Sequence, residues 1–142
     1  MKGIYALRIR LNKDVSIRVG ALGNVHFKKG DYVYVGSAQS NLEKRVERHL
    51  RRSEKKLFWH IDYFLCDERA KIKEVIVRQA GKPAECELAQ ELLRQGEPVH
   101  KFGCSDCQCQ SHLFWFPKIP SSLELEVIAF SHGWSRFDIR DN

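Results

Sequence analysis

The sequence predicts one α+β domain in which a small, mainly antiparallel sheet is flanked by helices. Two observations predict this fold class. Apolar and polar residues alternate near the N-terminus, which is typical of strands, and from about residue 41 the apolar residues recur at helical spacing. The 142 residues suffice for one hydrophobic core and contain no Gly-, Ser- or Pro-rich tract. We therefore expect a single domain over residues 1–142.

Strands are predicted throughout the N-terminal quarter. In residues 3–11 the odd positions from Tyr5 onward are apolar while Arg8 and Arg10 point the other way, which is the pattern of a half-buried strand. Residues 15–19 and 25–27 alternate similarly around a turn at 20–23 and predict a hairpin. The aromatic and β-branched run 32–35 predicts a further strand that ends at Gly36.

The first helix is predicted over about residues 41–52. Ser40 and Glu43 have the spacing of a capping box, which satisfies backbone N–H groups at a helix start. One apolar face is expected for this helix, made of Leu42, Val46, His49 and Leu50.

Helices and strands alternate in the remaining chain. Residues 57–65 are aromatic and apolar, and both a short helix packed on the sheet and a strand fit them. Further expected elements are a strand at 72–77, a helix at 85–94 before Gly96, an irregular loop at 102–110, a strand at 112–116, and a C-terminal helix from Ser121 that Gly133 closes.

Composition restricts the classes of function. Twenty-four Lys and Arg against 18 Asp and Glu give a net charge of +6, which favours polyanionic partners such as nucleic acid. No apolar h-region follows Met1 and no window has the length of a membrane span, so we expect a cytoplasmic protein. The 5 cysteines indicate reduced thiols or a metal site rather than a disulfide framework.

Two short motifs lie at defined positions in the predicted strands. The first strand begins with Gly3-Ile4-Tyr5, and Tyr34-Val35-Gly36 ends a later strand directly before a helix that carries Arg45 and His49. In this order and spacing the sequence resembles the GIY-YIG nuclease superfamily, with valine at the middle position of the second motif.

A narrower likeness extends over nearly the whole chain. The sequence looks like a largely archaeal branch of that superfamily that is sometimes fused to endonuclease III type DNA glycosylases. The likeness rests on the runs Trp59-His60-Ile61-Asp62-Tyr63, Glu85-Cys86-Glu87-Leu88-Ala89, and Ser105-Asp106-Cys107 to His112-Leu113. It implies DNA repair, and a DNA glycosylase as a partner.

The resemblance also implies a set of site residues. In the superfamily, motif tyrosines, a helix arginine and a downstream glutamate line one site. In this sequence these residues are Tyr5, Tyr34, Arg45 and Glu85, and His49 is a further catalytic candidate.

Hydrolysis of a phosphodiester gives each of these residue types a task. Glu85 would bind Mg²⁺ or Mn²⁺, and Arg45 would hold the phosphate through its planar fork. Tyr5 or Tyr34 would position the attacking water or pass its proton. Glu85 is preferred over Glu87 because Leu88 lies three residues after Glu85, as in the family pattern, whereas Gln90 follows Glu87 at that spacing. Glu91 lies farther along the helix, where a solvated carboxylate is the simpler interpretation.

A basic stripe is expected on the same helix. Residues four apart on a helix are stacked, so Arg45 and His49 share a side that Arg48 and Arg52 flank, and both flanking arginines are candidates for nucleic-acid binding. Plainer interpretations stay open. The tyrosines fit sheet packing, Arg45 fits a solvated position, and His49 fits a hydrogen-bonded core position.

The loop near residue 104 allows two interpretations. Its soft and borderline ligands, spaced C-x-x-C-x-C-x-x-H, would suit zinc, and they are Cys104, Cys107, Cys109 and His112. Against this, four ligands from one short loop demand a tightly wound backbone. The alternative is a hydrogen-bonded loop with small buried cysteines, in which Asp106, Ser111 and His112 lie near the active site. His60 and Asp62 share a face only if their segment is a strand.

The sequence thus predicts a divalent-metal-dependent endonuclease or nickase that acts on nucleic acid, with DNA favoured over RNA as the substrate. Two hypotheses compete with it. One is a non-catalytic nucleic-acid-binding module that keeps the fold and serves as a partner of a glycosylase. The other is a zinc-stabilised structural protein whose tyrosines are packing residues.

Overall fold

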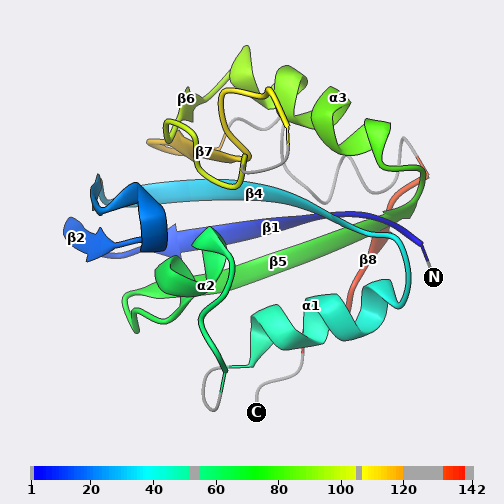
Figure 1. Cartoon of the computed structure of the whole chain (residues 1–142), viewed down its shortest axis with the longest axis horizontal. Helices are drawn as coiled ribbons and strands as arrows, with labels where there is room; N and C mark the ends of the chain where they lie inside the picture. Colours follow the sequence, from blue (N-terminus) through cyan, green and yellow to red (C-terminus); the bar gives the residue numbers. More distant parts are fainter. Residues whose placement is uncertain (1, 52–54, 105–106, 120–132, 140–142) are drawn as a thin grey trace.

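An antiparallel sheet forms the centre of the molecule (Figure 1). The structure is a computed structural model and describes residues 2–51, 55–104, 107–119 and 133–139. Within these residues six strands form one sheet in the order β6-β7-β4-β1-β5-β8, and each neighbouring pair is antiparallel. These strands are β1 (Gly3–Leu11), β4 (Gly30–Ala38), β5 (Ala70–Gln79), β6 (Glu97–Pro98), β7 (Leu113–Phe116) and β8 (Ser135–Arg136). The predicted α+β class is confirmed.

Helices cover both faces of the sheet. One core joins the sheet to α1 (Leu42–Leu50) and α2 (His60–Leu65), through Val46 and Phe64 among others. A second core joins the opposite face to α3 (Pro83–Leu93), through Ala89 and Leu92. Figure 1 shows α3 on one side of the strands and α1 with α2 on the other. The result is a three-layer arrangement with the sheet in the middle.

The central strand β1 is buried more completely than its sequence pattern predicts. Its odd residues lie in the core beneath α1 and α2, as expected. However, Ile4 and Ala6 on the other face are each only 1% exposed, because they lie in the second core with α3. The half-buried pattern holds only farther along, where Arg8 pairs with Glu74 at 3.0 Å and Arg10 with Asp31 at 3.3 Å.

The predicted hairpin is present beside the main sheet. Strands β2 (Val15–Arg18) and β3 (Asn24–Phe27) pair antiparallel around the short 3-10 helix η1 (Gly20–Leu22). Figure 1 shows this hairpin at one end of the sheet. Phe27 stacks on Phe64 of α2 with 4.6 Å between ring centroids, so the hairpin closes that end of the first core.

The helices differ from expectation mainly at their ends. Helix α1 begins after Asn41, which has a left-handed φ of 53°, and no side chain caps it, so the predicted capping box of Ser40 and Glu43 is wrong. Helix α2 decides between the two interpretations of residues 57–65 in favour of a helix. Helix α3 starts two residues earlier than predicted, because the first turn of a helix accommodates Pro83.

The prediction for the C-terminal part is tested only in the described residues. The expected helix from Ser121 to Gly133 falls largely on residues 120–132, which lie outside the described residues. Strands β6 and β8 were not predicted, since two residues each are too few to show alternation. No helix in the described ranges is long and apolar enough to cross a membrane.

The site described next is positioned by the end of β4. Strand β7 pairs with β4 only from Asp31 to Tyr34. One residue later, the N–H of Val35 donates to the carbonyl oxygen of His112 (2.9 Å), which holds the 102–112 loop against the strand. The 102–110 segment contains only turns and bends among its described residues, as predicted.

Candidate functional site

Four residues that the motifs single out lie around one cavity of about 680 Å³. Tyr5 and Tyr34 come from the sheet, Arg45 from α1 and Glu85 from α3, and we call this cavity the tyrosine pocket. The tyrosines belong to the core under α1, whereas α3 covers the opposite face. The pocket lies where β4 continues beyond its pairing with β7, and residues from both helical layers line it. Trp59, His60 and Lys82 also line it, and none of the three was predicted as a site residue.

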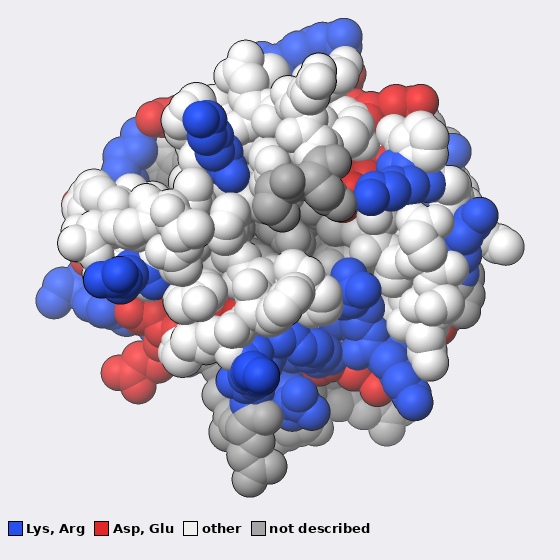
Figure 2. All heavy atoms as spheres, viewed as in Figure 1, with Lys and Arg blue, Asp and Glu red and all other residues white. Residues whose placement is uncertain are grey.

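Basic side chains lie on the surface beside the tyrosine pocket. Figure 2 shows Lys and Arg gathered over the area where α1 lies in Figure 1, with acidic side chains among them. Helix α1 supplies Arg45, which lines the pocket, and Arg48 three residues later. The pocket thus adjoins a surface that attracts anions.

Gly36 of the second motif has a steric role in the pocket. It lies directly across from Tyr5 in the pairing of β1 with β4. A Cβ atom at position 36 would overlap the ring and the hydroxyl of Tyr5. Because glycine has no side chain, position 36 leaves room for the Tyr5 side chain to lie across β4.

Glu85 is the glutamate of α3 that reaches the pocket. Its side chain is 13% exposed and lines the cavity. Glu87 is exposed, and Glu91 pairs with Arg94 at 2.7 Å on the solvent side. Within the described lining of the pocket, Glu85 is the only carboxylate.

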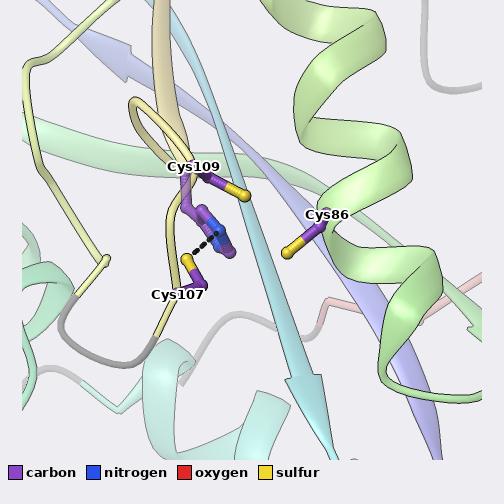
Figure 3. Close-up of side chains that lie close together, drawn as sticks. Cys86, Cys107 and Cys109 are labelled. Atoms are coloured by element: carbon purple, nitrogen blue, oxygen red, sulfur yellow. Dashed lines mark hydrogen bonds between the residues drawn. The ribbon is translucent and has the colours of Figure 1, made fainter.

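A second group of chemically reactive side chains lies next to Glu85. Cys86 points from α3 toward Cys107 and Cys109 of the loop (Figure 3). Donor atoms of these three cysteines and of His112 all lie within 4.8 Å of one another, and we call this set the cysteine cluster. Three sulfurs and one imidazole are a common ligand set for structural zinc, so the cluster can hold a metal ion.

The structure differs from the predicted ligand set in one member. Cys104 is not part of the cluster, and its thiol donates instead to the carbonyl oxygen of Phe102 (3.4 Å). Its place is taken by Cys86, which was noted only as part of a family-like run. Because α3 supplies one ligand, the loop has to supply only three metal ligands instead of four. The loop backbone therefore need not be wound as tightly as the predicted set required.

His112 connects the cluster to the pocket. Its Nε2 lies 3.3 Å from the sulfur of Cys107, and its Nδ1 lies 3.6 Å from Oε2 of Glu85. The ring is 2% exposed. Burial alone would lower the pKa of His112, but the Glu85 carboxylate raises it above the usual value.

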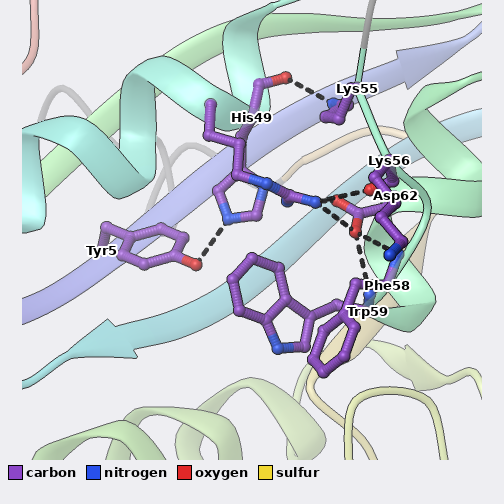
Figure 4. A network of polar contacts seen from close by, with 8 residues as sticks. Tyr5, His49, Lys55, Lys56, Phe58, Trp59 and Asp62 are labelled. Atoms are coloured by element: carbon purple, nitrogen blue, oxygen red, sulfur yellow. Dashed lines mark hydrogen bonds and ion pairs between the residues drawn. The ribbon is translucent and has the colours of Figure 1, made fainter.

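Tyr5 and His49 form a buried pair beneath the pocket. The Tyr5 hydroxyl and Nε2 of His49 share a hydrogen bond of 2.6 Å (Figure 4). Nδ1 of His49 has no hydrogen-bond partner within the described part of the chain. Burial lowers the pKa of His49 to about 3, so this histidine is neutral near pH 7.

Burial also governs the two pocket tyrosines. It raises the pKa of Tyr5 above the ordinary range, although the nearby Arg45 opposes the shift. It raises the pKa of Tyr34 as well, and the neighbouring Tyr5 and Glu85 add to the effect. Both phenols therefore keep their protons at neutral pH and act as hydrogen-bonding groups.

Arg45 is held in place by contacts that leave its charge beside the pocket. Its Nη1 donates to the carbonyl oxygen of Ser37 (3.1 Å), and its guanidinium carbon lies 4.3 Å from the centre of the Trp59 ring. Carbonyl and aromatic partners orient a guanidinium without neutralising it. Arg45 is thus arranged for an anionic ligand.

Arg48 makes several contacts within the protein. Two of its nitrogens donate to the Asp62 carboxylate at 2.7 and 2.9 Å, and one also donates to the carbonyl oxygen of Lys56 (2.7 Å). This ion pair ties α1 to the start of α2, and Figure 4 shows Asp62 beside Trp59. The nucleic-acid role of Arg48 stays a prediction, but its fork is already occupied. Arg52 lies outside the described residues.

Asp62 and His60 diverge on α2, as expected for residues two apart on a helix. Asp62 also accepts from the N–H groups of Phe58 (2.9 Å) and Trp59 (2.8 Å). Although burial alone would raise the pKa of this carboxyl, the hydrogen bonds from Arg48 and from these N–H groups hold it below its usual value. Nδ1 of His60 accepts from the N–H of Gly103 (2.9 Å), which anchors the loop at the pocket.

Comparison with known proteins identifies a family for this chain. Residues 4–133 fit the model of a protein family described as a domain of unknown function, DUF123. The match spans most of the chain, including both the pocket and the cluster. No curated protein and no solved structure matches this sequence.

Proposed function

This chain belongs to the DUF123 family, and we propose that it is a divalent-metal-dependent endonuclease or nickase that hydrolyses phosphodiester bonds in DNA. The observation that carries the proposal is the convergence of Tyr5, Tyr34, Arg45 and Glu85 on one pocket beside a basic surface. These residues are spread over 81 positions of the sequence, from 5 to 85 counted inclusively. They are also the set that the resemblance to GIY-YIG nucleases implies.

The dimensions and charge of the pocket suit a phosphodiester. A volume of about 680 Å³ falls in the range of small-molecule sites and accommodates one or two nucleotides. Arg45 offers a planar fork that matches phosphate oxygens, and Trp59 beneath it limits its rotation. In the proposed reaction, Arg45 binds the scissile phosphate and stabilises the charge that develops on it.

The tyrosines act as positioning groups in this scheme. Because burial keeps both phenols protonated, Tyr5 and Tyr34 orient a water molecule or a phosphate oxygen through hydrogen bonds. His49, which is neutral and bonded to the Tyr5 hydroxyl, fixes the direction of that hydroxyl. His49 is therefore proposed as a positioning residue rather than a base.

Glu85 fits the requirements of a Mg²⁺ or Mn²⁺ ligand. Magnesium usually binds one or two carboxylates and keeps several waters, and Glu85 presents one largely buried carboxylate to the pocket. When bound, such a cation supplies a Lewis acid that lowers the barrier to attack on the phosphate. A second cation, zinc, is proposed for the cysteine cluster, whose sulfur ligands do not suit magnesium.

Cleavage assays test the proposal directly. Labelled duplex, flap, branched and single-stranded DNA would be incubated with Mg²⁺ or Mn²⁺ and with wild type, Arg45→Ala or Glu85→Gln. We expect metal-dependent cutting of at least one substrate by wild type and a loss of 100-fold or more in each variant, roughly the effect of removing one transition-state contact. Lys44→Ala and Glu87→Gln are matched controls, since both residues are exposed on the same helices.

The control variants and the binding behaviour decide between the proposal and its rivals. Equal losses in Lys44→Ala and Arg45→Ala would point to general electrostatics instead of a site. Salt-sensitive DNA binding without cleavage of any substrate would instead select the non-catalytic binding module, with a DNA glycosylase as the partner to test. Preference for the corresponding RNA substrates would contradict the assignment to DNA.

A further inference from the structure

The cysteine cluster and Glu85 lie next to each other, and this arrangement suggests that the two sites are connected. Glu85 and Cys86 are consecutive residues in the first turns of α3, yet Glu85 lines the pocket and Cys86 faces the cluster. His112 lies between the two, with one ring nitrogen toward each. A ligand of the cluster therefore also contacts the residue proposed to act in the pocket.

We propose that a zinc ion bound by Cys86, Cys107, Cys109 and Nε2 of His112 holds Glu85 in the tyrosine pocket through the Nδ1–H of His112. The zinc site is inferred from the donor distances alone and does not depend on the proposed function. Only the value of a fixed Glu85 for catalysis rests on the proposed function.

The positions of the donor atoms fit tetrahedral zinc. With zinc–sulfur bonds of about 2.3 Å and zinc–nitrogen bonds of about 2.0 Å, the ligand atoms of a tetrahedron lie about 3.5 to 3.8 Å apart. All donors of the cluster lie within 4.8 Å of one another, and the Cys107 sulfur is 3.3 Å from Nε2 of His112. Metal binding therefore requires shifts of about 1 Å or less.

The origin of the ligands gives the ion a structural task. Cys86 is on α3, whereas Cys107, Cys109 and His112 are on the loop that follows β6. A single ion would fasten this loop, which forms part of the pocket through Gly103, to the helix that carries Glu85. Metal–ligand bonds, rather than packing of the loop alone, would then fix the position of the loop relative to α3.

The tautomer of His112 follows from the site. A zinc ion on Nε2 leaves the proton on Nδ1, and that N–H then donates toward Oε2 of Glu85, now 3.6 Å away. Carboxylate–histidine–zinc arrangements of this kind orient both partners and strengthen metal binding. One Glu85 oxygen is engaged in this way, and the carboxylate has a second oxygen for a ligand in the pocket.

The identity of the bound ion is tested first. Protein purified without chelators would be analysed by mass spectrometry for metals, and one zinc per chain is expected. Cobalt exchanged into the wild-type protein should show intense thiolate-to-metal absorption, which requires no variant to fold. Absence of zinc together with absence of this absorption would overturn the site.

Ligand identity is tested with serine variants. Cys86→Ser and Cys109→Ser should each lose zinc or weaken the cobalt–thiolate band, whereas Cys104→Ser and the exposed Cys66→Ser should retain both. Retention of zinc by Cys86→Ser with loss in Cys104→Ser would mean that the loop alone binds the metal, which would contradict the link to α3.

The link to Glu85 is tested by affinity rather than by activity. Glu85→Gln should lower zinc affinity about 10-fold in competition with a chelator, as loss of such an outer partner typically does, and Glu87→Gln should not. Equal affinities in the two variants would refute the positioning role. Neither zinc binding nor its affinity depends on cleavage. A zinc-loaded protein that cuts no DNA would therefore contradict the nuclease proposal but not this inference.

Discussion

The ion pair between Asp62 and Arg48 should dominate the stability of the segment that carries Arg45. The Asp62 side chain is 0% exposed and accepts two hydrogen bonds from Arg48 and one each from the N–H groups of Phe58 and Trp59. Asp62→Ala removes all of these acceptors. Removing one partner of a buried pair costs about 3–5 kcal/mol, and because Arg48 is 21% exposed we expect about 3 kcal/mol.

Thermal and urea unfolding followed by circular dichroism would measure this effect. For a chain of this size, about 3 kcal/mol corresponds to a decrease of roughly 10 °C in Tm. Glu91→Ala is the matched control, since its pair with Arg94 has side chains that are 50% and 72% exposed and should contribute less than about 1 kcal/mol. If Asp62→Ala and Glu91→Ala unfold at the same temperature, the reasoning is refuted.

The same carboxylate predicts a pH dependence. Its pKa in the folded protein lies below the usual value, so its contribution to stability is complete above the unfolded pKa of about 3.9. That contribution is lost as the pH falls further, through the folded pKa, because the protonated group no longer pairs with Arg48. The stability difference between wild type and Asp62→Asn should therefore be constant from pH 5 to 7 and shrink below pH 4. A difference that grows on acidification would contradict the assignment.

Two further changes probe the pocket. Gly36→Ala should destabilise the fold by about 1–3 kcal/mol in urea unfolding, because the new methyl group meets the buried Tyr5 ring. Gly81→Ala, whose methyl group meets only an ordinary contact, should stay within about 0.5 kcal/mol, and equal effects would remove the steric argument. Phe58→Ala should weaken binding of single-stranded DNA about 5-fold or more in fluorescence anisotropy, because Phe58 is 72% exposed at the pocket and can stack on a base. Leu57→Ala is its control, and a comparable loss there would exclude stacking.

Local pattern was sufficient for the elements on which the pocket is built. Alternation placed β1 at the residues where it occurs, and helical spacing placed α1 within two residues at either end. What alternation does not show is the second layer. Ile4 and Ala6 are apolar residues between apolar neighbours, and their burial depends on α3, which is some 80 residues away in sequence. Burial on both faces of β1 is a tertiary property.

The site residues divide in the same way. The tyrosines, Arg45 and Glu85 were predicted from motifs that lie within single elements, and the fold brings them to one cavity. Cys86 was missed as a ligand because a lone cysteine on a helix carries no spacing signal. The signal that was available is its place beside Glu85 in a run that already appeared informative. Cys104 was included because ligand spacing in a loop says nothing about which way each sulfur points.

Two partly buried polar arrangements lie beside different parts of the pocket. The Arg48–Asp62 pair joins α1 to the start of α2, and so fixes Trp59 against Arg45. With zinc bound, the cysteine cluster would join α3 to the loop and so fix the wall that contains Glu85. The two share no side chain, so loss of either should disturb one wall and leave the other. A pocket whose cationic and anionic groups are held independently can bring a phosphate and a metal ion together, because neither charge depends on the other for its position.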